Sequence, residues 1–252
     1  MRSWPGLLAV LLTACGGVAA PAATPDPVEG NVTVFAAASL TEAFNQVGAD
    51  FHARHQGAAV HFNFAGSSTL VTNLTNGAQA DVFASADEPN MAKVTAGGLT
   101  AAPPQIFATN KLEIVVGAGN PKHITGLADL AQPGLIVVLA APAVPAGHYA
   151  GQALQAAGVK VTPASLELDV KAVVSKVALG EADAGIVYVT DVRAGGARVA
   201  GAPIPDAQNV VARYPVAVLK GSSGAVAGQA FVDYLLGADG QKTLARFGFT
   251  GP

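Results

Sequence analysis

Serine residues stand at two points where an apolar segment gives way to a helical pattern. Ser39 follows the strand-like segment 32–37, and Ser67 and Ser68 follow a segment in which Val60, Phe62 and Phe64 alternate with polar residues. The first turn of a helix has unpaired backbone N–H groups and a partial positive charge. Hydroxyl and N–H donors at such starts have the chemistry needed to bind a small anion.

Two further junctions have the same character without a serine. Ala146 follows Pro145 at a third helix start, and Val170 follows Asp169, a typical N-cap residue, at a fourth. Taken singly, such positions are most often caps of helices that bind nothing. If the fold presents all four starts to one cleft, they offer neutral donors without Lys or Arg. Such a set suits a fully deprotonated oxyanion.

These positions require a scaffold of alternating strands and helices. Segments 32–37, 60–64 and 81–84 are predicted strands, and helices are predicted over 40–51, from about 69 to 77, and over 88–96. This alternation favours a parallel sheet covered by helices. Ligands of open α/β sheets bind at the carboxyl ends of the strands, where the four junctions fall.

A second set of elements follows. Predicted strands cover 111–116, 135–139 and 184–188, predicted helices begin at Ala146 and Val170, and two C-terminal helices are expected near 226–236 and 240–247. We expect residues 31–108 together with 215–252 to form lobe I, and residues 109–214 to form lobe II. The strands near 108–112 and 214–219 would then cross between the lobes as a hinge.

Composition excludes several classes of protein. The chain has 252 residues, of which 51% are hydrophobic and 12% charged, and its net charge is −3. It has no basic block for nucleic acid and, beyond the N-terminus, no apolar run of about 18 residues for a membrane bundle. The predicted partners therefore do not include nucleic acid.

Sequence motifs of enzymes and of metal-cation receptors are also missing. There is no complete G-x-S-x-G, Ser-x-x-Lys, H-E-x-x-H or Walker motif, and nothing marks a catalytic carboxylate pair. The five histidines have no metal-ligand spacing, and the four tyrosines stand apart. We therefore expect a protein that is not an enzyme, with no catalytic residue, no cofactor and no metal cation.

The N-terminus has the pattern of an export signal. One positive charge in residues 1–3 precedes the short apolar run 6–12, and the single cysteine, Cys15, follows at the position of a lipobox. We expect residues 1–14 to be a signal peptide, Cys15 to be lipidated, and residues 15–30 to form a flexible linker rich in proline and small residues. The predicted location is the outer face of the cell membrane.

Several motifs resemble the molybdate-binding proteins of ABC importers, in order and at similar spacing from about Val32 to Thr250. The matching segments are Val34–Leu40, Phe64–Leu70, Ala80–Asp87, Val144–Ala150, Gly185–Tyr188, Tyr214–Val218 and Arg246–Thr250. One departure is Gly66-Ser67-Ser68, where many relatives have three serines.

The resemblance implies a two-lobed, periplasmic-binding-protein-like α/β fold. Each lobe would be a mostly parallel sheet flanked by helices, with the ligand cleft at the hinge. It implies that the protein binds molybdate or tungstate as an oxyanion and, as a monomer, delivers it to an ABC permease and its ATPase. The residues that the motifs assign to the ligand are Ser39, Ser67, Ala146, Val170 and Tyr188.

Another tetrahedral oxyanion, sulfate or phosphate, remains the alternative ligand. Sulfate is fully ionised and differs from molybdate mainly in size. Phosphate carries a proton at neutral pH and needs an acceptor, which Asp169 or Asp81 would supply if either faced the cleft. We expect Asp169 to cap its own helix, because a carboxylate beside a dianion would repel it.

Overall fold

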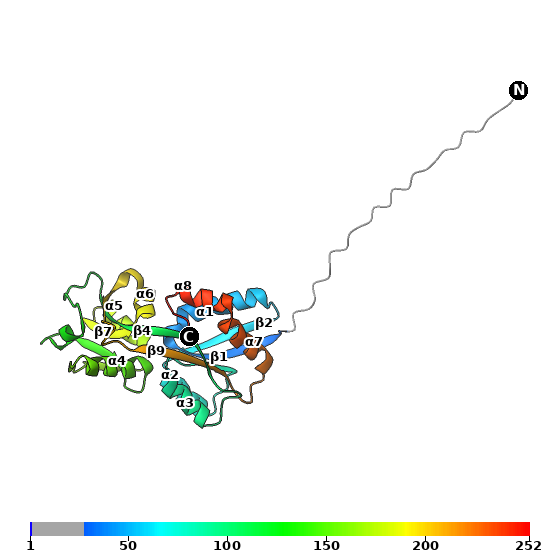
Figure 1. Ribbon diagram of the computed structural model, residues 1–252, viewed down its shortest axis with the longest axis horizontal. Helices are drawn as coiled ribbons and strands as arrows, with labels where there is room; N and C mark the ends of the chain where they lie inside the picture. The colour runs from blue at the N-terminus through cyan, green and yellow to red at the C-terminus, as the bar shows by residue number, and fades with distance from the viewer. Residues whose placement is uncertain (2–27) are drawn as a thin grey trace.

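The computed structural model describes Met1 and residues 28–252, so the predicted signal peptide, Cys15 and nearly all of the predicted linker lie outside the described residues. Two α/β lobes lie side by side, and two long strands run between them (Figure 1). The strands that join the lobes are β4 (Gln105–Gly117) and β9 (Val211–Val218). The predicted lobe boundaries fall at the two strands that both lobes share, and they stay a prediction.

The first lobe carries the N-terminal elements and the last two helices. Its elements are β1 (Gly30–Ala37), the 3-10 turn η1 (Ala38–Leu40), α1 (Thr41–Arg54), β2 (Ala58–Ala65), α2 (Ser67–Thr75), β3 (Val82–Ala84), α3 (Glu88–Ala96), α7 (Ala225–Leu236) and α8 (Ala238–Arg246). The predicted helices of this lobe are present, with ends that differ by a few residues from the predictions.

The second lobe is built from the middle of the chain. Its elements are η2 (Leu127–Ala131), β5 (Val137–Ala140), α4 (Pro145–Ala156), β6 (Ser165–Glu167), α5 (Val170–Ala178), β7 (Ala184–Tyr188), α6 (Val189–Gly195), η3 (Gly196–Arg198) and β8 (Val199–Pro203). The short elements α6 and β8 are not among the predicted ones.

Within residues 28–252 the strands form one nine-stranded sheet in the order β2-β1-β3-β9-β4-β7-β5-β6, with β8 paired to β4. In each lobe three neighbouring strands are parallel, β2-β1-β3 in the first and β6-β5-β7 in the second. The pairs that involve β4 or β9 are antiparallel. Each lobe therefore contains a parallel three-stranded unit, and the antiparallel pairs are those made by the two strands, β4 and β9, that run between the lobes.

The parallel register brings the predicted helix starts to common edges. Ala37 of β1 lies opposite Ala65 of β2, so the chain leaves both strands at the same edge to enter η1 and α2. In the second lobe Ala140 of β5 lies opposite Glu167 of β6, and the chain continues from these strands to α4 and α5. The pairing thus places two helix starts on each lobe at one end of its strands.

Aromatic residues hold the first lobe together. The ring of Phe44 on α1 lies 5.6–6.0 Å, between centroids, from the rings of Phe62, Phe107 and Phe231, and Phe44 itself is fully buried. Aromatic pairs at this spacing contribute about 0.5–1.5 kcal/mol beyond the burial of their area. The face of α1 that carries Phe44 is therefore the face that packs on the sheet.

Candidate functional site

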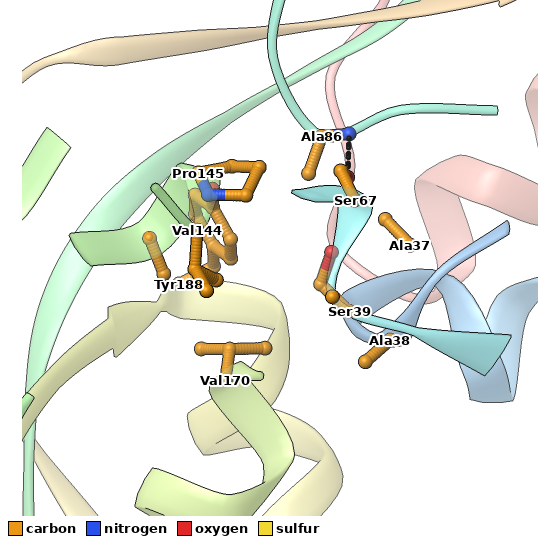
Figure 2. A pocket seen from close by; sticks show the side chains of 11 residues that line it. Ala37, Ala38, Ser39, Ser67, Ala86, Val144, Pro145, Val170 and Tyr188 are labelled. Carbon is orange, nitrogen blue, oxygen red and sulfur yellow. Dashed lines mark hydrogen bonds between the residues drawn. The ribbon is translucent and has the colours of Figure 1, made fainter. Parts of the chain in front are cut away.

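A small hollow lies between the two lobes, and residues from both lobes line it (Figure 2). It is far smaller than the 300–1,000 Å³ or so that is typical of sites for drug-sized ligands. The lining residues are Ala37, Ala38, Ser39, Gly66, Ser67, Ala86, Val144, Pro145, Ala146, Val170 and Tyr188. All five residues that the sequence analysis assigns to a ligand are in this set, so the structure brings them together.

Four of these residues occupy the starts of helices. Ser67 and Val170 are the first residues of α2 and α5, and Ala146 is the second residue of α4. Ser39 lies in the 3-10 turn η1, which runs directly into α1. The N–H groups of a first turn have no partner within their own helix, and the helix dipole makes these ends attractive to an anion.

The hydroxyl of Ser39 belongs to a chain of neutral groups. Its Oγ lies 3.1 Å from the phenolic oxygen of Tyr214 on β9, and Asn110 Nδ2 on β4 donates to that phenolic oxygen at 3.4 Å. The same amide donates to Thr190 Oγ1 at 2.9 Å. Burial raises the pKa of Tyr214 far above its usual range, so the phenol keeps its proton. These hinge-strand residues thus hold Ser39 in place.

Ser67 is oriented by a backbone group. The N–H of Ala86, which follows β3, donates to Ser67 Oγ at 3.1 Å, and Ser67 is 1% exposed (Figure 2). Because the oxygen already accepts this bond, the hydroxyl proton is available to a second partner. Ser67 can therefore donate to an anion in the hollow while it remains held from behind.

Tyr188 contributes an unpaired hydroxyl. It ends β7, is 1% exposed, and its phenolic oxygen has no hydrogen-bond partner among the described residues. Leaving a buried polar group unsatisfied costs about 1–3 kcal/mol. Burial raises the pKa of Tyr188 well above its usual range, so the group is a neutral donor. A ligand oxygen in the hollow would satisfy it.

No charged side chain is among the residues that line the hollow, within the part of the chain that the structure describes. Asp169 caps α5, and its Oδ1 accepts from the Ala172 N–H at 2.9 Å, which confirms the predicted cap. Asp81 is bound elsewhere, to the N–H of Thr33 at 2.7 Å and the hydroxyl of Ser222 at 2.6 Å. Neither carboxylate therefore offers an acceptor to the hollow.

Charged groups lie behind the second lobe's side of the hollow. Lys171 Nζ, next in sequence to Val170, is 2.7 Å from Glu42 Oε2 and 3.3 Å from Asp191 Oδ1. Asp191 is fully buried, and its Oδ2 accepts from the N–H of Tyr188 at 3.2 Å. This network therefore ties the start of α5 to the end of β7.

Two of these charged groups have shifted pKa values. Burial raises the pKa of Asp191 to about 6, although the ammonium of Lys171 opposes the shift. Burial acts to lower the pKa of Lys171, but Asp191 and Glu42 outweigh it and leave that pKa above its ordinary value. At neutral pH the buried carboxylate and the ammonium are therefore both charged.

The two lobes contact each other near residues that line the hollow. The ion pair of Glu42 on α1 with Lys171 on α5 crosses from lobe to lobe, and Asn90 Nδ2 on α3 donates to the carbonyl oxygen of Ala143 at 3.3 Å. None of these four residues is among the predicted site residues. A single charged or amide residue on a helix is ordinarily exposed to solvent, and nothing in the neighbouring sequence distinguishes Glu42, Lys171 or Asn90 from such residues.

The residues that the structure describes contain no group of three or more His, Cys, Asp or Glu side chains that could hold a metal ion. None of the helices in this part of the chain is long and apolar enough to cross a membrane.

A two-lobed α/β protein with a small hollow of neutral donors beside its hinge is a solute-binding protein of the periplasmic type. The model of the bacterial extracellular solute-binding proteins matches residues 32–250, and the chain belongs to this family. The predicted fold class and the resemblance are both confirmed by this match and by the relatives.

The chain is similar to the molybdate-binding protein ModA of Mycobacterium tuberculosis, with 44% identity over 98% of this chain and 95% of the relative. Two solved structures show the same fold at lower identity. The periplasmic molybdate-binding protein of Azotobacter vinelandii has a TM-score of 0.74 at 21% identity and covers 88% of this chain and 99% of its own. The sulfate-binding protein SubI of M. tuberculosis has a TM-score of 0.78 at 22% identity, covering 88% and 86%.

Proposed function

We propose that this protein is an extracytoplasmic receptor that binds molybdate or tungstate and delivers it to the permease and ATPase of an ABC importer. The observation that carries the proposal is the hollow itself, where hydroxyl and N–H donors from both lobes converge without a charged side chain. The ModA relative, which is similar over nearly its whole length, supports the same ligand. The proposed ligand contacts are Ser39, Ser67, Ala146, Val170 and Tyr188.

The donor set favours an anion without a proton. Serine hydroxyls, a protonated phenol and helix N-termini all donate, and none of the carboxylates considered as acceptors reaches the hollow. Hydrogen phosphate would leave its own proton without an acceptor, which costs free energy in a buried site. Molybdate and tungstate carry no proton at neutral pH, so every one of their oxygens can accept.

The proposed mechanism is a shift in population between open and closed forms. An anion in the hollow accepts from the first lobe through Ser39 and Ser67 and from the second lobe through Val170 and Tyr188. Because the open form cannot offer both sets of donors at once, the anion stabilises the closed form. The permease would then recognise closed lobes, and a lipid on Cys15 would keep the receptor at the membrane as a monomer.

The test is thermal unfolding of the purified protein with molybdate, tungstate, sulfate or phosphate at equal ionic strength. The only tryptophan is Trp4, which lies in the predicted signal peptide, so tryptophan fluorescence cannot follow unfolding of the mature protein. A dye or a calorimeter is used instead. A ligand at 100 times its dissociation constant adds about 2.7 kcal/mol to the free energy of unfolding. We expect molybdate and tungstate to raise the unfolding temperature and phosphate to leave it unchanged.

The anions that serve as controls also distinguish the alternatives. A rise with sulfate as large as that with molybdate would keep the class of ligand and overturn the proposed selectivity. If phosphate alone raised the unfolding temperature, an acceptor would have to face the hollow, and the inference that the hollow offers only donors would be wrong. No rise with any of the four anions would contradict the proposed function.

A further inference from the structure

The two serines of the hollow differ in the group that lies behind each hydroxyl. A serine hydroxyl can donate its own proton or accept one from a partner, so a serine does not by itself reject an anion that carries a proton. The direction of the bond behind the hydroxyl decides what it turns to the ligand. Behind Ser67 is the N–H of Ala86, at 3.1 Å from Oγ, which can only donate. Ser67 therefore turns its proton to the hollow.

The group behind Ser39 is a phenol, which can either donate or accept. Ser39 Oγ lies 3.1 Å from the phenolic oxygen of Tyr214, and Tyr214 is fully buried on β9. If the phenol accepted from Ser39, the serine would turn a lone pair to the hollow and could bind a protonated anion. If the phenol donates, the proton of Ser39 is the one that faces the ligand. The direction of this single bond therefore decides what the serine offers.

A buried amide on β4 fixes the direction of that bond. Asn110 Oδ1 accepts from the N–H of Lys111 at 2.9 Å, which orients the amide with its nitrogen toward the phenol. The Nδ2 group donates one proton to Thr190 Oγ1 at 2.9 Å and the other to the phenolic oxygen of Tyr214 at 3.4 Å. The phenolic oxygen thus already accepts a hydrogen bond.

The proton of the Tyr214 phenol then has one acceptor. Burial raises the pKa of Tyr214 far above its usual range, so the proton is present at neutral pH. Among the described residues the phenolic oxygen of the neighbouring Tyr188 makes no hydrogen bond, which leaves Ser39 Oγ as the acceptor. The opposite direction would leave the phenolic proton buried without an acceptor, which costs free energy. The order of donation is therefore Asn110 to Tyr214, Tyr214 to Ser39, and Ser39 to the hollow.

We propose that Tyr214 is a specificity-determining residue: by donating to Ser39 Oγ it turns the Ser39 proton into the hollow, so that the first lobe rejects an anion that carries a proton. The inference rests on the proposed function and deepens it. Tyr214 does not line the hollow itself, so it is a positioning residue that acts through Ser39.

The experiment measures two anions on Tyr214→Phe in the full chain. Molybdate carries no proton at neutral pH, whereas hydrogen arsenate is a tetrahedral anion of similar size that carries one. Without the phenolic hydroxyl the Ser39 side chain can rotate and accept from the arsenate proton. Calorimetric titration of molybdate, with and without excess arsenate, gives both dissociation constants. We expect molybdate affinity to fall only a few-fold and the preference for molybdate over arsenate to fall at least tenfold.

Two further variants separate the direction of the bond from other effects. Tyr234→Phe deletes a phenolic hydroxyl on α7, away from the hollow, and should keep the wild-type preference. Asn110→Leu keeps the phenol of Tyr214 and removes the amide that fixes its direction. We expect this variant also to lose preference for molybdate over arsenate. Because it leaves Tyr214 in place, it tests the same inference if Tyr214→Phe does not fold.

A structural role for Tyr214 alone gives a different result. Loss of packing or of lobe closure would weaken both anions by the same factor and leave the preference unchanged. That outcome, or arsenate that displaces molybdate from neither the wild type nor Tyr214→Phe, would overturn the inference. An unchanged preference in Asn110→Leu would overturn the assigned direction of the bond.

The outcomes also separate this inference from the proposed function. If the wild type binds molybdate and Tyr214→Phe keeps its preference, only the role of Tyr214 is wrong. If the wild type binds sulfate instead of molybdate, the proposed ligand is wrong, and sulfate against arsenate decides the role of Tyr214 in the same variants. A wild type that binds arsenate as tightly as molybdate, or that binds none of these anions, would overturn both.

Discussion

The two walls of the hollow supply donors of different kinds. On the first lobe, Ser39 and Ser67 present hydroxyls that neutral groups hold, a phenol in one case and a backbone N–H in the other. On the second lobe, Ala146 and Val170 present backbone groups, and Tyr188 is the one hydroxyl among the lining residues from that side. Behind this second wall lies the ion pair of Lys171, which is partly exposed, with the fully buried Asp191.

This comparison distinguishes the residues that position a hydrogen-bond donor from the residues that would contact the anion. Neutral groups line both walls, so a dianion meets dipoles on either side. The ion pair does not line the hollow but contacts or adjoins residues that do: Asp191 accepts from the Tyr188 N–H, and Lys171 follows Val170 in the sequence. A charged residue can therefore position the second wall without being a ligand, and substitutions on the two walls should have distinguishable consequences.

The largest expected effect on binding is that of Tyr188→Phe, which removes the side-chain donor of the second wall. A hydrogen bond to a charged group contributes about 1.5–3 kcal/mol, so affinity for molybdate should fall roughly 10- to 100-fold. The ligand-free protein should not lose stability, because the deleted hydroxyl has no partner among the described residues. Calorimetric titration and thermal unfolding measure the two effects.

The matched control is Tyr234→Phe on α7, which is remote from the hollow. It should leave affinity unchanged. Equal affinity in Tyr188→Phe and the wild type would mean that the second wall binds through backbone groups alone.

The second effect concerns Asp191, the buried carboxylate that accepts from the Tyr188 N–H and pairs with Lys171. Because the folded pKa of Asp191 is about 6 and the ordinary value is 3.8, the folded state binds the proton more tightly between about pH 4 and 6. Raising the pH through this window removes that proton from a buried site, so this group's contribution to stability falls. Relative to Asp191→Asn, the wild type should lose on the order of 2–3 kcal/mol of unfolding free energy across the window.

Denaturant unfolding of both proteins at several pH values measures this difference. Asparagine keeps an acceptor for the Tyr188 N–H but removes both the titration and the charge that faces Lys171. The test therefore uses the change of the stability difference with pH and not its absolute size. If the difference between the two proteins stays constant from pH 4 to pH 6.5, Asp191 does not titrate in this window and the charged support of the second wall is misassigned.

The third effect tests the neutral support of the first wall. Ser67→Ala removes a donor and also leaves the buried N–H of Ala86 without its acceptor. The ligand-free protein should lose about 1–3 kcal/mol, and affinity should fall as well. Ser67→Ala should therefore destabilise the free protein where Tyr188→Phe does not, as thermal unfolding without ligand would measure.

Ser68→Ala is the control for this variant, since Ser68 lies in the same turn but does not line the hollow. Unchanged stability in Ser67→Ala would show that the Ala86 N–H finds another acceptor.

The smallest expected effect is that of Glu42→Gln, which breaks the ion pair between the lobes. The two side chains are partly exposed, so the pair should contribute at most about 1 kcal/mol to closure and weaken binding only a few-fold. Asp206→Asn, which breaks the exposed pair with Lys111 away from the hollow, should leave affinity unchanged. If Glu42→Gln lost as much affinity for molybdate as Tyr188→Phe, the ion pair between the lobes would contribute as much to closure as a hydrogen bond to the anion, which would contradict this ranking.

The sequence predicted the helix starts that carry the site because their signals are local. A strand that ends before a serine, or a proline or aspartate before a helical pattern, can be read over a few residues. Ser39, Ser67, Ala146 and Val170 were named in this way. Tyr188 came from the resemblance alone, since a tyrosine at the end of an apolar strand is ordinarily a core residue.

Contacts between distant segments were not predictable in the same way. Nothing near Ser39 points to Tyr214, 175 residues away, and nothing near Glu42 points to Lys171, 129 residues away. The short elements α6 and β8 were also missed. The seven residues of α6 span only about two helical turns, and β8 consists mainly of alanine, glycine and proline, which are depleted in strands.

The sequence by itself determined the alternation of strands and helices and the residues that begin the helices, because hydrophobic period and helix caps act within a few residues. Only the tertiary structure decided that these starts share one hollow, that Asp169 and Asp81 bond to groups outside it, and that Glu42 pairs with Lys171 across the lobes. The physical reason is that such contacts depend on how the sheet pairs its strands and how the lobes meet across the hinge. Those distances follow from the packing of the whole chain.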